Sequence, residues 1–171
     1  MSNIVESNSA YIINLIGDVC GKAPGKKKLQ KLVYLIEQKG VPLGYEHGLH
    51  FYGPYSSKLD EETMSLSMDG VISFDYSGCS HKMSVNTGYE IKSSLTKKDE
   101  AVAREVIDHF KNRTPLELEL LSTALYAHDN LEDKSRGSII NGVKKIKGDK
   151  YNVQEIEQAL NDFCFFNKKI S

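Results

Sequence analysis

The segment 52–59, with the sequence YGPYSSKL, constrains the fold of this chain more than any other stretch, because it contains residues that end one element and begin another. Gly53 and Pro54 predict the end of a short strand over 49–52, since proline has no backbone N–H to donate to a strand ladder. The serines that follow favour a helix start, because a serine hydroxyl can accept a hydrogen bond from a first-turn amide. The chain therefore changes from strand to helix within this segment.

A helix of about three turns is predicted next, over 57–69. Ser57 and Asp60 have the spacing of a capping pair, in which the serine hydroxyl accepts from the Asp60 amide. Gly70 suits the left-handed conformation in which many helices end. The apolar and aromatic residues over 71–76 then predict a strand.

A polar, glycine-bounded stretch over 77–88 separates that strand from a second one over 89–91, so the two are predicted to form a hairpin with a long tip. Two amphipathic helices are predicted earlier, over 7–20 and 26–39, from apolar residues at helical spacing. Two helices, a strand, a helix and a hairpin follow one another in the order of a winged helix. We therefore expect a winged-helix-like unit over 1–95.

The second half of the chain, 96–171, is predicted to be helical throughout. Thr114, Pro115 and Glu117 give a strong start signal, with a capping threonine, a proline in the first turn and a glutamate at the third position. The helix that they begin is apolar on nearly all sides, which indicates a central helix packed by several neighbours. Other helices are predicted over 96–110, 135–147 and 152–167. The expected fold class is α+β and mostly α, with this helical subdomain packed on the first unit as one compact domain.

Composition excludes several classes of protein. The chain has 171 residues, 40% of them apolar, and a formal charge of −1, so it has no overall attraction to nucleic acid or anionic lipid. Residues 1–10 lack the pattern of a signal peptide, and no apolar run reaches the roughly 20 residues that span a bilayer. Cys20, Cys79 and Cys164 are odd in number and too widely spaced to indicate a disulfide framework. We expect a cytoplasmic protein.

Five lysines around the start of the helix over 26–39 are the first candidate site. They are Lys22, Lys26, Lys27, Lys28 and Lys31. Contact with phosphates is one interpretation, and a solvated helix face is the other. Lysines in the first turn oppose the helix dipole at a cost of about 0.3–1 kcal/mol each, so capping does not explain them.

The helix over 57–69 occupies the recognition position of a winged helix. Its single lysine, Lys58, is set against four carboxylates, which are Asp60, Glu61, Glu62 and Asp69. Phosphates would repel these carboxylates, and the helix offers no Arg, Asn or Gln for base contacts. Base readout by this helix is therefore disfavoured, and a protein partner is favoured.

No set of residues in the sequence converges on catalysis or metal binding. Cys79 and His81 lie two apart at the predicted hairpin tip, whereas a zinc site normally needs four ligands and a catalytic cysteine needs a shielded cleft. Glu117 and Glu119 are also two apart, a spacing that points them to different faces of a helix. A further basic stretch is interpreted as a solvated helix end, and its lysines are Lys145, Lys147 and Lys150. We expect no enzymatic activity, no metal and no cofactor.

The tyrosines of the segment 52–59 have two interpretations. Tyr52 and Tyr55 can simply pack, beside a glycine that gives freedom and a proline that ends the strand. Alternatively, Tyr55 and Ser57 lie exposed at the helix start, where free amides and the positive end of the dipole can receive an anionic group.

Residues 28–35 (KLQKLVYL) followed by YGPYS resemble the YwgA-like family of uncharacterised bacterial and archaeal proteins, and more distantly the Panacea (SocA-like) domain. Both groups show such a helix, a Tyr-Gly-Pro turn, and a helix ending near a glycine and two aliphatic residues, here Gly70, Val71 and Ile72. The similarity covers about 26–72. It implies a small cytoplasmic protein and, for Panacea-like members, an antitoxin-type role in binding and neutralising a toxin encoded nearby.

We therefore expect a non-enzymatic protein-interaction module of antitoxin-like type, which binds and neutralises a partner protein. The residues predicted to bind that partner are Tyr52, Gly53, Pro54, Tyr55, Ser57, Asp60 and Glu61. The alternative is a winged-helix transcription regulator that binds DNA through its wing and the five lysines. The sequence leaves the oligomeric state open.

Overall fold

The computed structural model describes residues 2–171, which form an α+β protein made mostly of helix, as predicted. The helices are α1 (Asn8–Cys20), α2 (Lys26–Gln38), α3 (Ser57–Met68), α4 (Lys97–Phe110), α5 (Pro115–Asn130), α6 (Arg136–Lys147), α7 (Val153–Leu160) and the 3-10 helix η1 (Phe163–Phe166). The strands are β1 (Asn3–Glu6), β2 (Gly48–His50), β3 (Gly53–Tyr55), β4 (Ile72–Asp75), β5 (Lys82–Val85) and β6 (Tyr89–Lys92). They pair as β1 with β6, β2 with β3, and β4 with β5.

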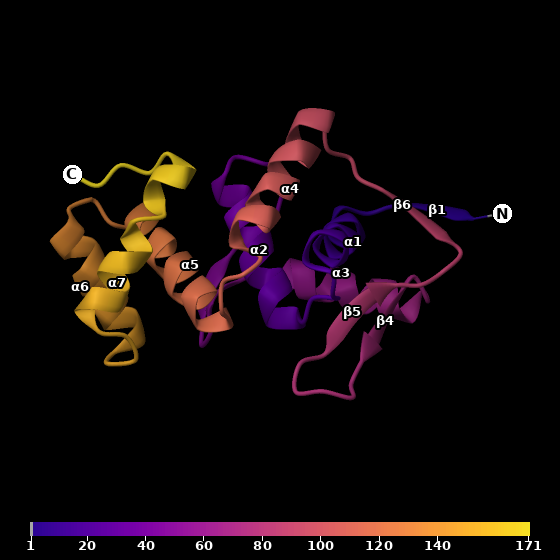
Figure 1. Cartoon of the computed structure of the whole chain (residues 1–171), viewed down its shortest axis with the longest axis horizontal. Coiled ribbons are helices and arrows are strands. Elements are labelled where there is room, and N and C mark those ends of the chain that lie inside the picture. The colour runs from indigo at the N-terminus through magenta and orange to yellow at the C-terminus, as the bar shows by residue number, and fades with distance from the viewer. Residues whose placement is uncertain (1) are drawn as a thin grey trace. The chain divides into compact units, whose positions relative to one another are not determined.

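The chain divides into two compact units. In Figure 1 the first is coloured from indigo to pink and the second from orange to yellow, except that the short segment Leu49–Pro54 of the second unit has an early-chain colour. Unit 1 contains the residues up to Gly48 together with Tyr55–Asn112, and unit 2 contains Leu49–Pro54 and Arg113–Ser171. The division therefore falls after residue 112 and not after residue 95. The reason is that α4 packs against α1 and α2 and belongs with them.

The core of unit 1 is built on α1 and α2, whose apolar residues recur at helical spacing as the sequence predicts. From α1 the fully buried side chains include Ile12, Ile13 and Ile16, and from α2 they include Leu32 and Ile36. Burying each such side chain contributes about 1.5–3 kcal/mol relative to exposure. This core fixes the positions from which α3 and the strands extend.

The hairpin of unit 1 differs from the prediction. β4 pairs antiparallel with β5, in a register that places Ile72 opposite Val85 and Asp75 opposite Lys82. The strand predicted to return over 89–91 is β6 instead, and it pairs parallel with β1. The sequence KMSV of β5 hides its strand character because only Met83 is fully buried in it. The hairpin tip is consequently shorter than predicted and follows Asp75 (Figure 1).

The predicted strand end and helix cap within the segment 52–59 are also wrong in detail. Pro54 lies inside β3, which a proline can join because a two-stranded sheet consists of edge strands. The N-cap of α3 is Ser56 and not Ser57: its backbone is extended, and its Oγ accepts a hydrogen bond from Leu59 N–H at 3.3 Å. The helix then begins at Ser57 and ends as predicted before Gly70, whose φ is +75°.

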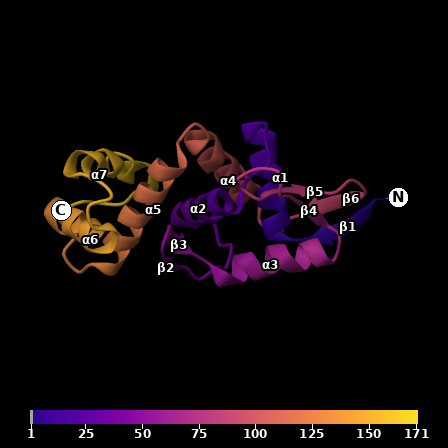
Figure 2. The ribbon, with the colours of Figure 1, turned by 90° about the horizontal axis from the view of Figure 1, so that it is seen from below.

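Unit 2 consists of α5, α6, α7 and η1 with the short segment Leu49–Pro54, and the three helices lie together in Figures 1 and 2. α5 is buried along most of its length, from Leu118 to Leu125, and packs on both α6 and α7. The predicted capping boxes at Thr114 and Asn152 are confirmed. The last helix is shorter than predicted, because η1 replaces its C-terminal part.

Candidate functional site

An open groove of about 610 Å³ lies along α3 in unit 1. Residues of β1, the start of α1, the 41–47 loop and α3 line it, and four of these carry carboxylates. They are Glu6, Glu61, Glu62 and Asp69, set against the single lining lysine, Lys58. We call this feature the acidic groove. Its charge indicates a preference for cationic groups.

Tyr45 forms one wall of the acidic groove and ties the loop to α3. Its ring is buried, and its hydroxyl donates a hydrogen bond of 2.5 Å to Glu62 Oε2. Burial and this carboxylate both raise the pKa of Tyr45, so the phenol stays protonated and remains a donor. The ammonium of Lys58 lies 5.6 Å from the Tyr45 ring centroid and donates to the Gly44 carbonyl. Lys58 is therefore already engaged with the wall of the groove.

Two side chains behind Tyr45 hold its backbone in place. Glu37 accepts a hydrogen bond from the backbone of Tyr45. The His47 side chain forms a second hydrogen bond with the Tyr45 backbone. Burial raises the pKa of Glu37 to about 7, against the opposing effects of that hydrogen bond and of Lys58. Burial, with the charge of Lys31, lowers the pKa of His47 to about 4. Glu37 Oε1 and His47 Nε2 have no hydrogen-bond partner within residues 2–171, so both groups favour their neutral forms.

The residues predicted from the segment 52–59 and α3 are divided between the two units. Glu61 lines the acidic groove. Asp60 lies 3.7 Å from Lys26 Nζ, and Tyr55, whose pKa is raised by burial, hydrogen-bonds to Asp60. These carboxylates at the start of α3 count against an anionic ligand there, although Ser57 is exposed as that interpretation requires. The predicted residues Tyr52, Gly53 and Pro54 fall in unit 2.

A buried hydrogen-bonded clamp explains why the helix over 28–35 and the YGPYS segment occur together. The Gln30 side chain donates from Nε2 to Ser56 O at 2.9 Å, and its Oε1 accepts from Ser56 N–H at 2.8 Å. Gln30 and Ser56 are both buried, so each amide group satisfies the other where water is absent. The clamp fixes the residue that caps α3, which gives this part of the motif a structural role.

The loop between α1 and α2 lies beside the β4–β5 hairpin, an arrangement that the sequence does not show. Gly25 pairs with Lys82 in a β-bridge, and Met83 N–H donates to Pro24 O at 2.8 Å. A Cβ on Gly25 would lie 3.0 Å from Ser80 Cβ, so glycine permits this close approach.

This arrangement joins the predicted lysines to the hairpin in a surface that we call the wing–lysine surface. Its members are Lys22, Lys26, Lys27, Phe74, Tyr76, His81 and Lys82. Lys26 Nζ lies 5.3 Å from the Phe74 ring centroid, and the exposed Tyr76 contacts His81 edge to face. Of the other two predicted lysines, Lys31 is buried and Lys28 is half-buried with its Nζ on Cys20 Sγ.

Unit 2 contains a buried ionic cluster that sequence reasoning missed. Glu119 lies 3.3 Å from Lys147 Nζ and 2.7 Å from Lys150 Nζ, and it accepts a hydrogen bond from the Tyr151 hydroxyl. The side chains of Glu119 and Lys147 are only 5% and 6% exposed, so Lys147 does not belong to a solvated helix end. Burial alone would raise the pKa of Glu119, but hydrogen bonds from Lys150 and Tyr151 and the charge of Lys147 lower it.

The ionic cluster also supports an exposed aromatic pair. Lys147 Nζ donates to Phe51 O at 2.8 Å, and Lys150 Nζ lies 6.0 Å from the Tyr52 ring centroid. Phe51 and Tyr52 themselves are 82% and 45% exposed and meet edge to face. The cluster thus holds the turn between β2 and β3.

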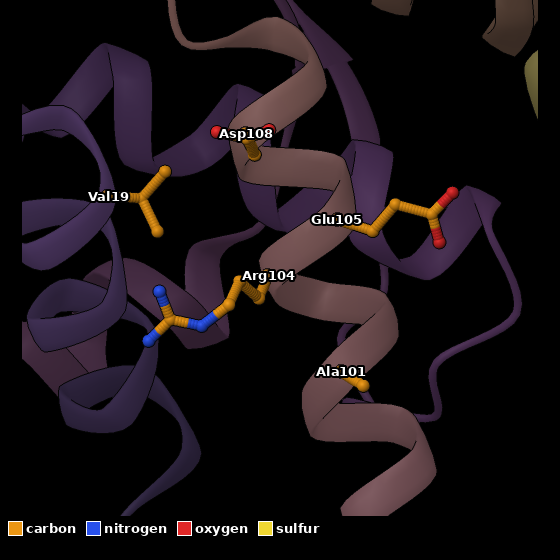
Figure 3. A pocket seen from close by; sticks show the side chains of 5 residues that line it. All are labelled: Val19, Ala101, Arg104, Glu105 and Asp108. Atoms are coloured by element: carbon orange, nitrogen blue, oxygen red, sulfur yellow. The ribbon is translucent and has the colours of Figure 1, made fainter.

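A second hollow of about 490 Å³ lies between α1 and α4, and Figure 3 shows Val19 and Arg104 pointing across it. Arg104 forms an ion pair of 2.8 Å with Asp18, and Asp108 forms one with Lys111 at the same distance. All four side chains are exposed to water, where such pairs contribute about 0–1 kcal/mol. This hollow offers no buried polar group for a ligand.

Over residues 2–171, no group of three or more His, Cys, Asp or Glu side chains is arranged to hold a metal ion. Nor do these residues include a helix with the length and apolar character needed to cross a membrane. The cysteines Cys20, Cys79 and Cys164 are free thiols, and Cys79 is exposed at the hairpin tip.

The chain is thus a small α+β protein with a helical second unit and an acidic groove in its first unit. No family model matches the chain. A protein of Bacillus subtilis (strain 168), described as uncharacterized protein YwgA, is 30% identical over 152 residues, which cover 82% of this chain and 85% of that protein. The chain belongs to the YwgA family. This confirms the nearer of the two predicted resemblances, and the similarity to Panacea domains stays a prediction.

Proposed function

We propose that this protein is a protein-interaction module whose acidic groove binds a basic segment of a partner protein. The observation that carries the proposal is the Tyr45–Glu62 wall beside Glu61, because it combines a rigid aromatic side chain with carboxylates at an open surface. Cationic side chains would find complementary charge there, which speeds association and selects against acidic partners. The loop behind the wall is held by Glu37 and His47, so the groove is formed before a partner arrives.

The role that we propose for this binding is of antitoxin type, in which the bound partner is a toxin that the interaction neutralises. The resemblance of 26–72 to Panacea domains suggests this role. In this proposal the Gln30–Ser56 clamp positions α3. Glu61 and Glu62 stand on that helix.

Co-expression with the product of a neighbouring reading frame tests the proposal. We expect that product to inhibit growth when expressed alone and to co-purify with this protein when both are present. Glu61→Lys should weaken the complex at least tenfold, measured by calorimetry, because a charge is reversed in the groove. Glu105→Lys provides a matched control, since Glu105 is exposed on α4 outside the groove.

Two results would overturn the proposal. One is a complex whose affinity is unchanged by Glu61→Lys and by raised salt, which would place binding elsewhere. The other is an equal loss in both charge reversals, which would show a general charge effect without a defined groove.

A further inference from the structure

We infer that the wing–lysine surface of unit 1 is a binding site for single-stranded nucleic acid. This function goes beyond the proposed interaction module and uses none of the residues that line the acidic groove. Phosphates would contact Lys22, Lys27 and Lys82, and an unpaired base would stack on Tyr76. The site becomes visible only in three dimensions, because it joins residues from two segments about 50 positions apart.

The backbone contacts between the two segments assemble the cations. The Gly25–Lys82 bridge and the Met83–Pro24 hydrogen bond fix the loop that follows α1 against β5. Lys82 consequently lies beside the start of α2, where Lys26 and Lys27 are found. Lys22, Lys27 and Lys82 are exposed. Each lysine that neutralises a phosphate releases counterions, which gives affinity that falls with added salt.

Carboxylates near this surface partly offset its charge. Asp60 is paired with Lys26 at 3.7 Å, and Asp75 lies opposite Lys82 in the ladder. Asp75 also accepts hydrogen bonds from Ser77, which, with the charge of Lys82, lower its pKa. Lys26 is thus partly neutralised, and contact with phosphates is expected mainly from the exposed Lys22, Lys27 and Lys82. A moderate affinity with strong salt dependence is therefore expected.

The aromatic side chains favour a single strand over a duplex. Tyr76 is 64% exposed, stacks with Phe74 at 5.9 Å between ring centroids, and contacts His81 at 4.6 Å. Such a side chain offers a platform for an unpaired base, and stacking of this kind tolerates any base. The bases of a duplex are already stacked on one another. The acidic α3 also opposes insertion into a major groove.

Fluorescence anisotropy with labelled oligonucleotides tests the inference. The probes are a single-stranded DNA of about 20 thymidines, an RNA of the same length with uridines, and a duplex of random sequence. At about 50 mM salt we expect both single strands to bind at least tenfold more tightly than the duplex, and all binding to weaken steeply by about 200 mM salt. No binding of the single strands at the lower salt, or a preference for the duplex, would overturn the inference.

Substitutions locate the site. The double variant Lys27→Glu with Lys82→Glu should weaken binding at least tenfold and reduce the salt dependence by about 0.7 for each phosphate that is no longer neutralised. Tyr76→Ala should weaken single-strand binding about tenfold and leave the salt dependence unchanged.

Lys98→Glu and Phe51→Ala are matched controls, because Lys98 lies on α4 and Phe51 in unit 2, and both side chains are exposed. Equal losses in a control and its partner variant would contradict the assignment, as would unchanged binding in the double variant.

Discussion

Glu37 in unit 1 and Glu119 in unit 2 are both withdrawn from water, but their surroundings differ. Glu37 accepts a hydrogen bond from the Tyr45 backbone, and its Oε1 has no partner within residues 2–171. Glu119 contacts two lysines and a tyrosine hydroxyl. As a result the pKa of Glu37 is raised to about 7, whereas the pKa of Glu119 is lowered.

The difference shows that burial alone does not decide the charge of a carboxylate. Desolvation favours the neutral form in both units, and it is the largest single influence on each group. In unit 2 the cations reverse its effect because they lie within ion-pair distance. In unit 1 the neighbouring cation, Lys58, is engaged with Tyr45 and Gly44. The two carboxylates therefore make opposite contributions to the pH dependence of stability, Glu37 in unit 1 and Glu119 in unit 2.

The largest effect is expected from Glu119→Ala, which leaves the buried ammonium of Lys147 without its carboxylate. Breaking a buried pair in this way costs about 3–5 kcal/mol. Urea unfolding followed by far-UV circular dichroism measures the loss, and hydrogen exchange in α5 and α6 assigns it to unit 2. Glu157→Ala is the control, since Glu157 is exposed on α7. Equal stabilities of the two variants would mean that the cluster contributes nothing to stability.

The next effect is expected from Gln30→Glu, which creates a second carboxylate without a cation in unit 1. An ionised glutamate can accept from Ser56 N–H but cannot donate to Ser56 O, so this buried carbonyl keeps only the Asp60 N–H at 3.3 Å and faces a carboxylate oxygen. We expect a loss of about 2–3 kcal/mol at neutral pH. The loss should shrink as the pH falls toward about 4.5, because a protonated glutamate restores the donor. A loss independent of pH would contradict this account of the clamp.

The dependence of stability on pH compares the two native carboxylates directly. The folded pKa of Glu37 lies above its ordinary value of 4.5, so its contribution is present below pH 4.5 and is lost as the pH rises to about 7. Glu37→Gln should remove this loss, about 1–2 kcal/mol after allowance for partial exposure. Glu119 behaves in reverse: its contribution is present above pH 4.5 and is lost as the pH falls below that value.

Hydrogen exchange measured from about pH 4.5 to 7.5 resolves the two contributions by unit. In the natural chain the effects of Glu37 and His47 on the opening of α2 oppose each other, because the lowered pKa of His47 makes its contribution grow as the pH rises. In Glu37→Gln only the His47 contribution remains, so opening of α2 should become harder as the pH rises through this range. α5 should show no such trend. If the pH dependence of α2 is the same in Glu37→Gln as in the natural chain, Glu37 does not contribute to it.

How much of this could be predicted depends on how local the interactions are. The capping boxes at Thr114 and Asn152 and the buried face of α5 were predicted correctly, because a few neighbouring residues determine them. The partner of β4 was predicted wrongly, since the polar sequence of β5 conceals the single buried Met83. Glu61 was predicted as a partner-binding residue, whereas the groove wall at Tyr45 was missed.

Glu119 could not be found from the sequence because its tyrosine partner lies 32 positions away. The only signal in the sequence was the presence of a glutamate on α5, a mostly apolar helix with few other charged residues. A charge in such a position must find a partner, although nothing in the sequence indicates which one.

The last comparison removes a single hydroxyl from each unit, and one of the two substitutions, Tyr45→Phe, is expected to have the smallest effect of all. Tyr45→Phe deletes the hydrogen bond to Glu62, whose carboxylate can turn to water in the open groove, and one with Ser9, whose hydroxyl keeps Ser7 Oγ as a partner. The loss should therefore be about 0.5–1 kcal/mol. Tyr151→Phe deletes one partner of the buried Glu119 and should cost about 1.5–3 kcal/mol, since water cannot replace it. The substitutions are chemically identical, so urea unfolding of both variants isolates the effect of burial. A larger loss for Tyr45→Phe would contradict the contrast between the units, because it would show that the groove carboxylate depends on its tyrosine more than the buried one does.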